Sequence, residues 1–335
     1  MSVRFGLALD FWSTTKPLNK LLDDHAALLE LAEKYGFDSV WAGEHRPLAP
    51  EPGHVPSPLL ALASLARSTR LRLGTGVLLL PLWHPLQLAY DGAILDQLSA
   101  GRLVLGVGVG SPGVMKRYGV PPEEAASRMD EALALLKTLW AGEEPFEGKH
   151  FTVKGRLYPG PVQPGGPPIL VAGRLRRSVE RAATHGDGWY AATQYHFELI
   201  KKQAHRYRER LADMDQDPAN AIVAINRTTF VAETDEQARR EGNPYVSSVL
   251  NFYAQFGALQ DGQGHSLDPQ KDLFEMVGDE IHFTGSPETV RESIRKYVEA
   301  GVTQFNLRVS PGDLPLALAA RTVTLLGERV LPHFR

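Results

Sequence analysis

One local pattern recurs along this sequence and limits how the chain can fold. An amphipathic helix ends near a glycine, and a short apolar strand follows a few positions later. In the first occurrence leucine and alanine recur at helical spacing before Gly36, and residues 38–42 have the apolar character of a buried strand. Glycine suits the left-handed conformation that commonly follows a helix end. The pattern predicts an α/β protein whose parallel strands are joined by helices.

The same pattern returns at Gly101, Gly186 and Gly301. Pro85 and Ser286 stand where the first turn and the cap of two of these helices are expected. The expected strands cover 3–9, 38–42, 71–80, 103–107, 169–172, 189–192, 221–232 and 303–309. Because eight parallel strands can close on themselves, we expect a (β/α)8 TIM barrel, with an open doubly wound sheet as the alternative.

No linker divides the chain, so we expect one domain over residues 1–335 with two insertions. The first follows the fourth strand and is the Gly- and Pro-rich stretch 142–168, with a short strand at 151–153. The second follows the seventh strand at 241–281 and contains the polar, glycine-containing run 260–264. That composition is typical of a mobile loop, and this connection lies on the active-site face of a barrel, so we expect a lid.

Charge and composition exclude several classes of protein. The formal net charge is −3, with Lys and Arg spread along the chain, so we expect a small-molecule substrate rather than nucleic acid or a membrane surface. We see no basic leader and no apolar run of membrane-spanning length, which favours a cytoplasmic protein. There is no cysteine, which excludes disulfides, thiolate metal sites and a cysteine nucleophile. Redox chemistry would therefore need a bound cofactor.

Glu44 and His45 directly follow the second expected strand. The carboxyl ends of barrel strands and the loops after them form the active site. A carboxylate and an imidazole there could position a ring or exchange a proton with a substrate. A helix cap or a loop salt bridge is the structural alternative, and we favour the catalytic interpretation because of the strand-end location.

A basic segment follows the fifth strand and begins a helix; its candidate residues are Gly173, Arg174, Arg177 and Ser178. Backbone amides, the helix dipole and guanidinium groups could converge there on a phosphate. An ordinary basic helix face is the alternative. Arg128 lies near the start of another expected helix, and taken alone it is typical of a solvated charge.

Other chemical patterns are weaker. Gly108, Gly110 and Gly113 satisfy a GxGxxG spacing after the fourth strand, but Pro112 interrupts the turn, so we do not favour a dinucleotide-binding fold. We interpret the glycines as room for a flat ring to approach the backbone. Histidine spacing matches no known zinc motif and no GxSxG occurs, so a catalytic metal and a serine nucleophile are both disfavoured.

Several longer segments together resemble the bacterial-luciferase-like family of flavin oxidoreductases. They are residues 36–41 (GFDSVW) with Glu44 and His45, 73–81 (LGTGVLLLP) with 84–86 (HPL), 95–102 (LDQLSAGR) with 105–108 (LGVG), 168–173 (PILVAG), 186–189 (GDGW) and 283–290 (FTGSPETV). The segments extend along most of the expected barrel, so the set is more specific than any one of its members.

The resemblance implies a flavin lying across the barrel mouth. It implies that His45 is the active-site histidine and that Gly76 and Val77 form an unusual non-prolyl cis peptide beneath the ring. It also implies that Arg128 binds phosphate. The phosphate loop of the family corresponds to Gly173, Arg174, Arg177 and Ser178.

Two positions depart from luciferases themselves. Arg46 follows His45 where luciferases have a second histidine, and Val109 stands where they have an arginine that contacts phosphate. Arg174 and Arg177 are the candidates to supply that charge. The family divides between enzymes of reduced FMN and enzymes of the deazaflavin F420, and both cofactors stay open at this point.

Our leading hypothesis from the resemblance is a monooxygenase that receives reduced FMN from a separate flavin reductase. It would oxidise a carbonyl or similar small substrate through a C4a-peroxyflavin, with His45 as acid or base and Glu44 orienting it. The alternative is F420-dependent hydride transfer, and a third possibility is a flavin-binding protein without turnover. The family expectation for assembly is a homodimer.

Overall fold

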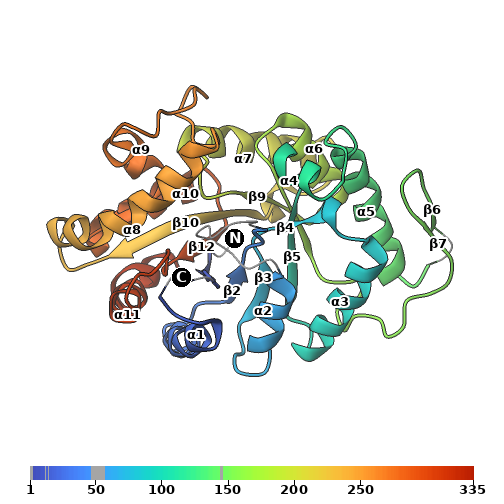
Figure 1. The fold of residues 1–335 in the computed structure, drawn as a ribbon, viewed down its shortest axis with the longest axis horizontal. Helices are drawn as coiled ribbons and strands as arrows, with labels where there is room; N and C mark the ends of the chain where they lie inside the picture. The colour runs from blue at the N-terminus through green and yellow to red at the C-terminus, as the bar shows by residue number, and fades with distance from the viewer. Residues whose placement is uncertain (1–2, 12, 14, 47–56, 144–145) are drawn as a thin grey trace.

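Eight parallel strands form a closed barrel at the centre of the molecule (Figure 1). The computed structural model describes residues 3–11, 13, 15–46, 57–143 and 146–335. In order around the barrel the strands are β1 (Arg4–Leu9), β2 (Ser39–Ala42), β3 (Arg72–Thr75), β5 (Leu103–Gly108), β8 (Ile169–Ala172), β9 (Gly188–Ala191), β10 (Val223–Val231) and β12 (Gln304–Arg308). Because β10 pairs with both β12 and β9, the two ends of this series of paired strands are joined and the ring is closed. The predicted barrel is confirmed and the open sheet is excluded.

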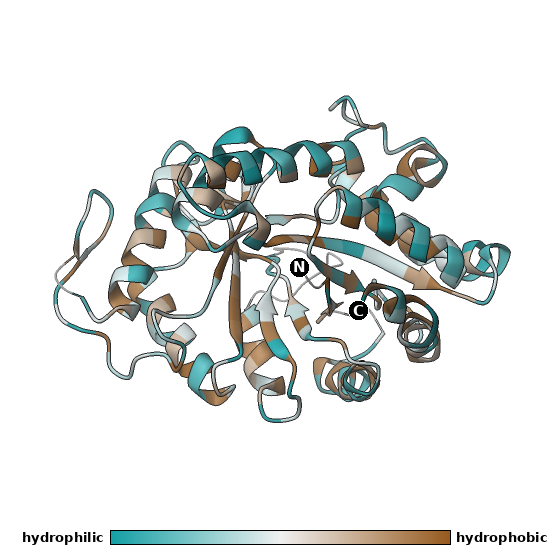
Figure 2. Cartoon of the chain, turned by 180° about the vertical axis from the view of Figure 1, so that it is seen from behind, coloured by the Kyte–Doolittle hydropathy of each residue, from teal (hydrophilic) through white to brown (hydrophobic). Residues whose placement is uncertain are grey.

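Helices cover the outside of the barrel and connect successive strands (Figure 1). They are α1 (Leu18–Lys34), α2 (Pro58–Leu65), α3 (Pro85–Leu98), α4 (Pro112–Arg117), α5 (Ala125–Trp140), α6 (Arg176–His185), α7 (Phe197–Ala212), α10 (Pro287–Glu299) and α11 (Leu316–Leu325). Figure 2 shows hydrophilic residues on their outer faces, because each helix buries one apolar stripe against the strands. In the described part of the chain, no helix is long and apolar enough to cross a membrane.

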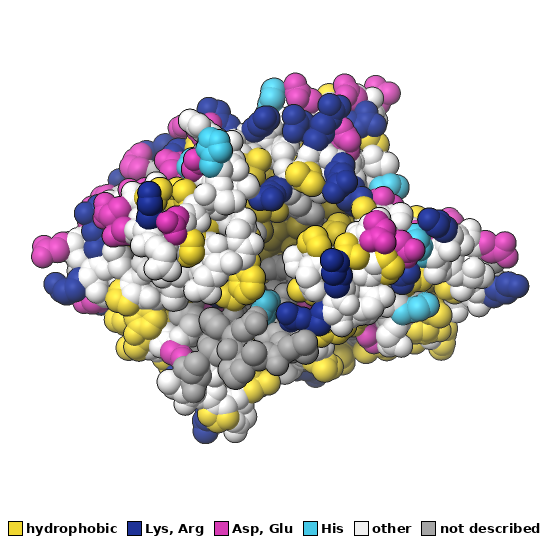
Figure 3. Space-filling model, turned by 45° about the horizontal axis from the view of Figure 1, so that its top comes forward, with side chains coloured by type: hydrophobic (Ala, Val, Ile, Leu, Met, Phe, Trp, Pro, Cys, Tyr) yellow, Lys and Arg dark blue, Asp and Glu magenta, His cyan; other side chains and the backbone are white. Residues whose placement is uncertain are grey.

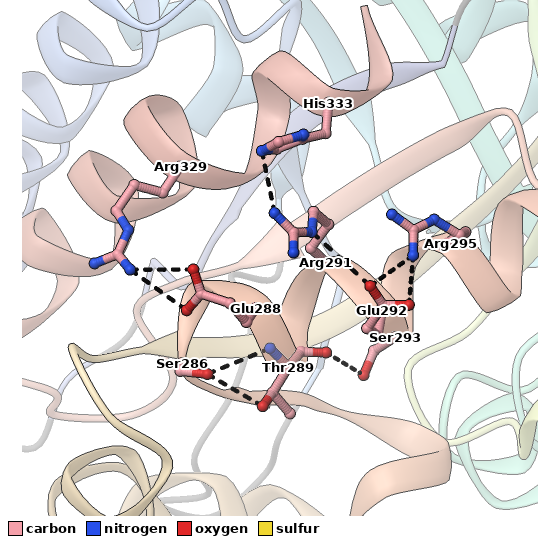
Figure 4. A network of polar contacts seen from close by, with 9 residues as sticks. All are labelled: Ser286, Glu288, Thr289, Arg291, Glu292, Ser293, Arg295, Arg329 and His333. Atoms are coloured by element: carbon pink, nitrogen blue, oxygen red, sulfur yellow. Dashed lines mark hydrogen bonds and ion pairs between the residues drawn. The ribbon is translucent and has the colours of Figure 1, made fainter.

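The glycines that end the repeated helices mostly have the expected backbone conformation. Gly36, Gly101 and Gly301 have φ angles of +71°, +79° and +92°, in the left-handed region that favours glycine. Gly186 ends α6 at the expected place, but its φ is −103°, so α6 ends without a left-handed residue. The Ser286 hydroxyl accepts a hydrogen bond from the Thr289 amide, which confirms the expected cap of α10 (Figure 4).

The interior of the barrel is filled mainly by two large aromatic side chains. Trp41 from β2 lies against Tyr190 from β9, with ring centroids 5.9 Å apart. Glycines on the neighbouring strands make room for the indole. A Cβ at Gly74 would lie 2.3 Å from the Trp41 ring, and a Cβ at Gly6 would lie 2.6 Å from its Nε1. The two glycines therefore fix where Trp41 can sit.

The first insertion lies along the outside of α5. It carries the short antiparallel pair β6 (Phe146–Glu147) and β7 (Thr152–Val153), which agrees with the predicted strand at 151–153. The Glu131 carboxylate on α5 accepts hydrogen bonds from the backbone amides of His150 and Phe151. These bonds bring the Phe151 ring to the first turn of α5, which is at the active-site end of the barrel.

The second insertion differs from the expected mobile loop, because most of it is helical. It contains α8 (Asp235–Gln255) and α9 (Leu273–Ile281), and only 256–272 is irregular apart from one antiparallel bridge between Gln260 and Ser266. The insertion has a small apolar core of its own, made of Leu250, Ala254, Leu259, Leu267, Leu273, Val277 and Ile281. The polar run at 260–264 misled the sequence interpretation, because it occupies only the tip of this helical unit.

Candidate active site

A cavity of about 250 Å3 opens at the carboxyl ends of the barrel strands. Figure 3 shows the hollowed face of the molecule, with hydrophobic side chains inside the hollow. The described lining residues are Glu44, His45, Gly76, Val77, Leu79, Tyr190, Ala192, Thr193, Gln194, Asn226, Ser248, Val249, Phe252, Tyr253, Arg308 and Gly312. Four of the predicted site residues, Glu44, His45, Gly76 and Val77, therefore line one cavity. The α8 residues Ser248 to Tyr253 form a wall that the sequence interpretation did not include.

The Glu44 carboxylate is buried and fully engaged with its surroundings. One oxygen accepts hydrogen bonds from the Leu79 amide at 2.6 Å and from the Trp83 indole at 3.1 Å, and the other accepts from Arg46. The Glu44 amide also donates to the Val77 carbonyl at 3.1 Å. Glu44 thus ties the end of β2 to the loop after β3, which places the neighbouring His45.

His45 lies between the barrel and the insertion after β10. Its imidazole contacts the Phe252 ring of α8 edge to face, with centroids 5.6 Å apart. Arg46 lies beside it, with its guanidinium 5.3 Å from the Trp83 ring and 5.0 Å from the Tyr118 ring. Arg46 therefore packs between aromatic rings and neutralises Glu44, at the position where luciferases have a histidine.

The peptide bond between Gly76 and Val77 is cis, at the position that the family resemblance implied. The loop that contains it crosses close to β5. A Cβ at Gly106 would lie 2.1 Å from the Thr75 carbonyl oxygen, and a Cβ at Gly108 would lie 3.1 Å from the Val77 side chain. Because Gly106 and Gly108 have no side chains, β5 can pack closely against this loop. Gly108 lies directly behind Val77, outside the lining of the cavity.

Four uncharged polar atoms in the barrel interior form no hydrogen bond of normal geometry within the protein. They are the Tyr190 hydroxyl oxygen, Asn226 Oδ1, Thr228 Oγ1 and Asn306 Nδ2, all buried. Burial raises the pKa of Tyr190, while Asn306 and Asn226 act against that shift. Buried polar atoms without a partner cost about 1–3 kcal/mol each, so this group is arranged for a ligand or bound water rather than for stability. Tyr190 and Asn226 line the cavity itself.

A buried ion pair stands at another side of the cavity. Arg308, at the end of β12, donates from Nε to both oxygens of Asp10, at 2.9 and 3.1 Å, and from a terminal nitrogen to Oδ2. The Gly312 amide also donates to Asp10 at 3.3 Å. Burial lowers the pKa of Arg308, but the Asp10 charge more than reverses this and leaves the pKa above its ordinary value.

The predicted phosphate loop lies beside the cavity, at the start of α6. Gly173 has a φ of +152°, and a Cβ there would lie 2.4 Å from the Ser178 side chain, so the loop folds tightly onto the first turn of the helix. Arg174 donates to the Gln260 side chain at 2.8 Å, which connects the loop to the insertion after β10. Arg177 is exposed on the same turn.

Arg128 lies at the start of α5, next to α6. Its guanidinium carbon is 4.9 Å from the centre of the Phe151 ring, and one terminal nitrogen is 3.9 Å from the Glu124 carboxylate, while its buried Nε has no hydrogen-bond partner. Arg181 on α6 pairs with Asp130 on α5, which holds the two helices together within their first two turns. The amino-terminal ends of α5 and α6 thus lie near each other, with Arg128 and Arg177 on them.

Sequence interpretation missed Tyr190, Asn226, Arg308 and Asp10. A signal was present in β12, where polar residues stand at every second position, at Gln304, Asn306 and Arg308, whereas the polar residues 226–229 of β10 are consecutive. This period places a run of polar side chains on the inner face of a barrel strand. Among the described residues, no group of three or more His, Asp or Glu could hold a metal ion.

The chain belongs to the luciferase-like monooxygenase family, whose model matches residues 3–304. It is 32% identical to the oxygenase component of a flavin-dependent trigonelline monooxygenase of Acinetobacter baylyi, over 71% of this chain and 66% of that protein. It is 29% identical to an F420-dependent glucose-6-phosphate dehydrogenase of Kineococcus radiotolerans, over 91% of this chain and 90% of that protein. The crystal structure of the monooxygenase RslO1 from Streptomyces bottropensis superposes with a TM-score of 0.87 at 28% identity, covering 99% of this chain and all of that one.

These relatives identify the protein as a TIM-barrel oxidoreductase of the flavin and F420 family. They divide between the two cofactors, and their names give different substrates. The cofactor and the substrate of this chain therefore have to be argued from the residues of its own site.

Proposed function

We propose that this protein is a monooxygenase that uses reduced FMN to oxidise a small organic substrate. The observation that carries the proposal is the cavity in which His45 and the cis peptide of Gly76 and Val77 meet. Further support comes from the nearly full-length likeness to a monooxygenase structure. Bound reduced flavin would supply the electrons for activating oxygen, which no side chain of this cysteine-free protein can supply.

The residues beside the cavity suit a flavin mononucleotide. The ring would lie against Gly76 and Val77, where Gly108 leaves room behind the loop. The phosphate would lie between the starts of α5 and α6, held by Arg128, Arg174 and Arg177 with the Gly173 and Ser178 loop. The unpaired, buried Nε of Arg128 supports this assignment, because a buried donor without an acceptor is costly unless a ligand supplies one.

In this proposal His45 is the acid or base nearest the reacting atoms, and Glu44 is a positioning residue. Glu44 holds the loop after β3 through Leu79 and Trp83, so it acts on His45 through the backbone. Phe252 and Val249 from α8 cover the cavity and exclude water from it. A separate flavin reductase would deliver the reduced cofactor, and the functional assembly would be a homodimer.

F420-dependent hydride transfer is the second candidate. It is favoured by the dehydrogenase relative that matches over 90% of its own length and by Val109, which stands where luciferases have a phosphate-contacting arginine. In that case the enzyme would need no oxygen, and His45 would manage the proton that accompanies the hydride.

Parallel titrations decide between the two. Purified protein is titrated with FMN, with reduced FMN under nitrogen and with F420, and oxygen uptake is then measured with a carbonyl panel. Tight binding of reduced FMN and substrate-dependent oxygen uptake support the monooxygenase. Selective binding of F420 with turnover under nitrogen would replace it by the dehydrogenase. Tight binding of oxidised flavin without any turnover would indicate a binding protein.

A further inference from the structure

The charges in the cavity wall are already balanced within the protein. Among the described lining residues, the acidic and basic side chains are Glu44, His45 and Arg308. Glu44 is paired with Arg46, and Arg308 is paired with Asp10. The Glu44 carboxylate and the Arg308 guanidinium are therefore both compensated within the protein.

The Arg308 pair matters most, because among the described lining residues Arg308 supplies the guanidinium group. The side chains of Arg308 and Asp10 are only 7% and 2% exposed, and the pair is bidentate. A carboxylate or phosphate that approached Arg308 would also approach the Asp10 carboxylate. In a poorly solvated cavity that repulsion offsets the attraction, so the pair offers a dipole rather than a cation.

The rest of the wall is apolar or uncharged. Val77 and Leu79 from the loop after β3, and Val249 and Phe252 from α8, supply apolar surface. The uncharged polar side chains of the wall can bond a neutral oxygen without adding charge; they are Tyr190, Thr193, Gln194, Asn226, Ser248 and Tyr253. Such a wall favours an apolar molecule with one or two hydrogen-bonding groups.

We infer that the substrate of this enzyme is an uncharged, mainly apolar molecule carrying a carbonyl or hydroxyl oxygen. Phosphorylated and carboxylated substrates are excluded by the balanced Asp10 and Arg308 pair. The type of reaction is taken from the proposed function. The charge and polarity of the substrate are inferred from the residues of the cavity wall.

Matched probes test the inference in the wild-type protein, with and without FMN. Cyclohexanone and cyclohexanecarboxylate have the same ring and differ in charge, and their binding is followed by tryptophan fluorescence and, with FMN, by the flavin spectrum. We expect the ketone to bind at least about tenfold more tightly, which corresponds to 1.4 kcal/mol. Equal or tighter binding of the carboxylate, or binding of neither probe, would overturn the inference.

An Asp10→Asn variant tests the physical reason. The amide keeps the size of the side chain but leaves the Arg308 charge uncompensated, so the preference should shift towards the carboxylate by about tenfold or more. The double variant Asp10→Asn with Arg308→Met removes both charges and should restore the preference for the ketone. Far-UV circular dichroism checks folding, and an unchanged preference in a folded Asp10→Asn protein would contradict the inference. If the variant does not fold, the wild-type comparison still decides.

Failure of this inference can be distinguished from failure of the proposed function. Failure of FMN to bind would reject the flavin assignment. The preference between the two probes in the cofactor-free protein would still test whether the cavity wall favours an uncharged molecule. Conversely, oxygen uptake with a carboxylate substrate would support the monooxygenase and reject the uncharged substrate.

Discussion

His45 and Tyr190 approach the cavity from opposite sides of the barrel, because β2 and β9 stand four places apart in a ring of eight strands. The strand-end rule found His45, since residues just after a barrel strand face the active site whatever the rest of the fold. It could not find Tyr190, which lies inside β9 and reaches the cavity from below. Its hydroxyl lies 2.6 Å from where a Cβ of Gly76 would be.

Replacing His45 by alanine tests its catalytic assignment. We expect turnover to fall by about 100-fold or more, as is typical of losing a general acid or base, while FMN affinity changes only a few-fold. The checks are oxygen uptake with the best carbonyl substrate and a flavin titration. His265→Ala, in an exposed side chain of the loop after α8, is the control and should change neither. Normal turnover in the His45 variant would remove His45 from the proposed mechanism.

Replacing Tyr190 by phenylalanine separates ligand binding from stability. The hydroxyl is buried near Asn226 and Asn306 but forms no hydrogen bond of normal geometry, so its removal should leave the ligand-free protein equally stable or more stable, by about 1 kcal/mol in urea unfolding. Binding of the ketone probe or of FMN should weaken, because that hydroxyl is available to bond the ligand. A clear loss of stability would mean that the hydroxyl is satisfied inside the protein. Unchanged binding of both would mean that it faces neither ligand.

At the level of helices and strands, the caps and turns are local, and they were predictable for that reason. Ser286 begins α10 through its own hydroxyl. Figure 4 shows it beside Thr289, together with the ion pair between Glu288 in the same first turn and Arg329 of the segment Leu326–Val330. The α8 and α9 unit was not predictable in the same way. Its helices are held by a small core that brings Leu250 against residues beyond the loop, such as Leu273 and Ile281.

A Ser286→Ala variant should lower the free energy of unfolding by about 1 kcal/mol, because the first turn of α10 loses its side-chain acceptor. The measurement is urea unfolding followed by circular dichroism. Ser293→Ala on the same helix is the matched control, since that hydroxyl only donates to the Thr289 carbonyl within the helix. We expect the control to change stability by less than about 0.5 kcal/mol. Equal effects of the two variants would argue against the cap.

For the whole molecule, the pH dependence of stability follows from buried histidines. Burial lowers the pKa of His25 from 6.5 to about 4 and that of His282 to about 3. As the pH falls, these histidines are therefore protonated at a higher pH in the unfolded chain than in the folded protein. The stabilisation that comes from these neutral, buried histidines is fully present above pH 6.5. It is lost as the pH falls from the pKa of histidine in the unfolded chain to its pKa in the folded protein.

The contribution of His25 between pH 6.5 and 4 should be about 3 kcal/mol, from 1.36 kcal/mol for each pH unit. A His25→Leu variant, which keeps an apolar contact with Phe11, should show a flatter fall in unfolding free energy over this range. His205→Leu, in an exposed side chain on α7, is the control and should follow the wild type. Parallel curves for all three proteins would show that His25 does not titrate in this way.

The sequence by itself determined the barrel and the residues at its strand ends, because the periods of strands and helices and the helix-ending glycines act over a few neighbouring positions. Glu44 and His45 were found by that local logic, while Gly76 and Val77 came from the family resemblance. Only the tertiary structure decided what faces them. Asp10 and Arg308 are 298 residues apart and meet because β1 pairs with β12, and α8 reaches His45 through Phe252 after an insertion of its own. The charge balance of the cavity depends on strand register, which joins distant residues and leaves no local pattern to read.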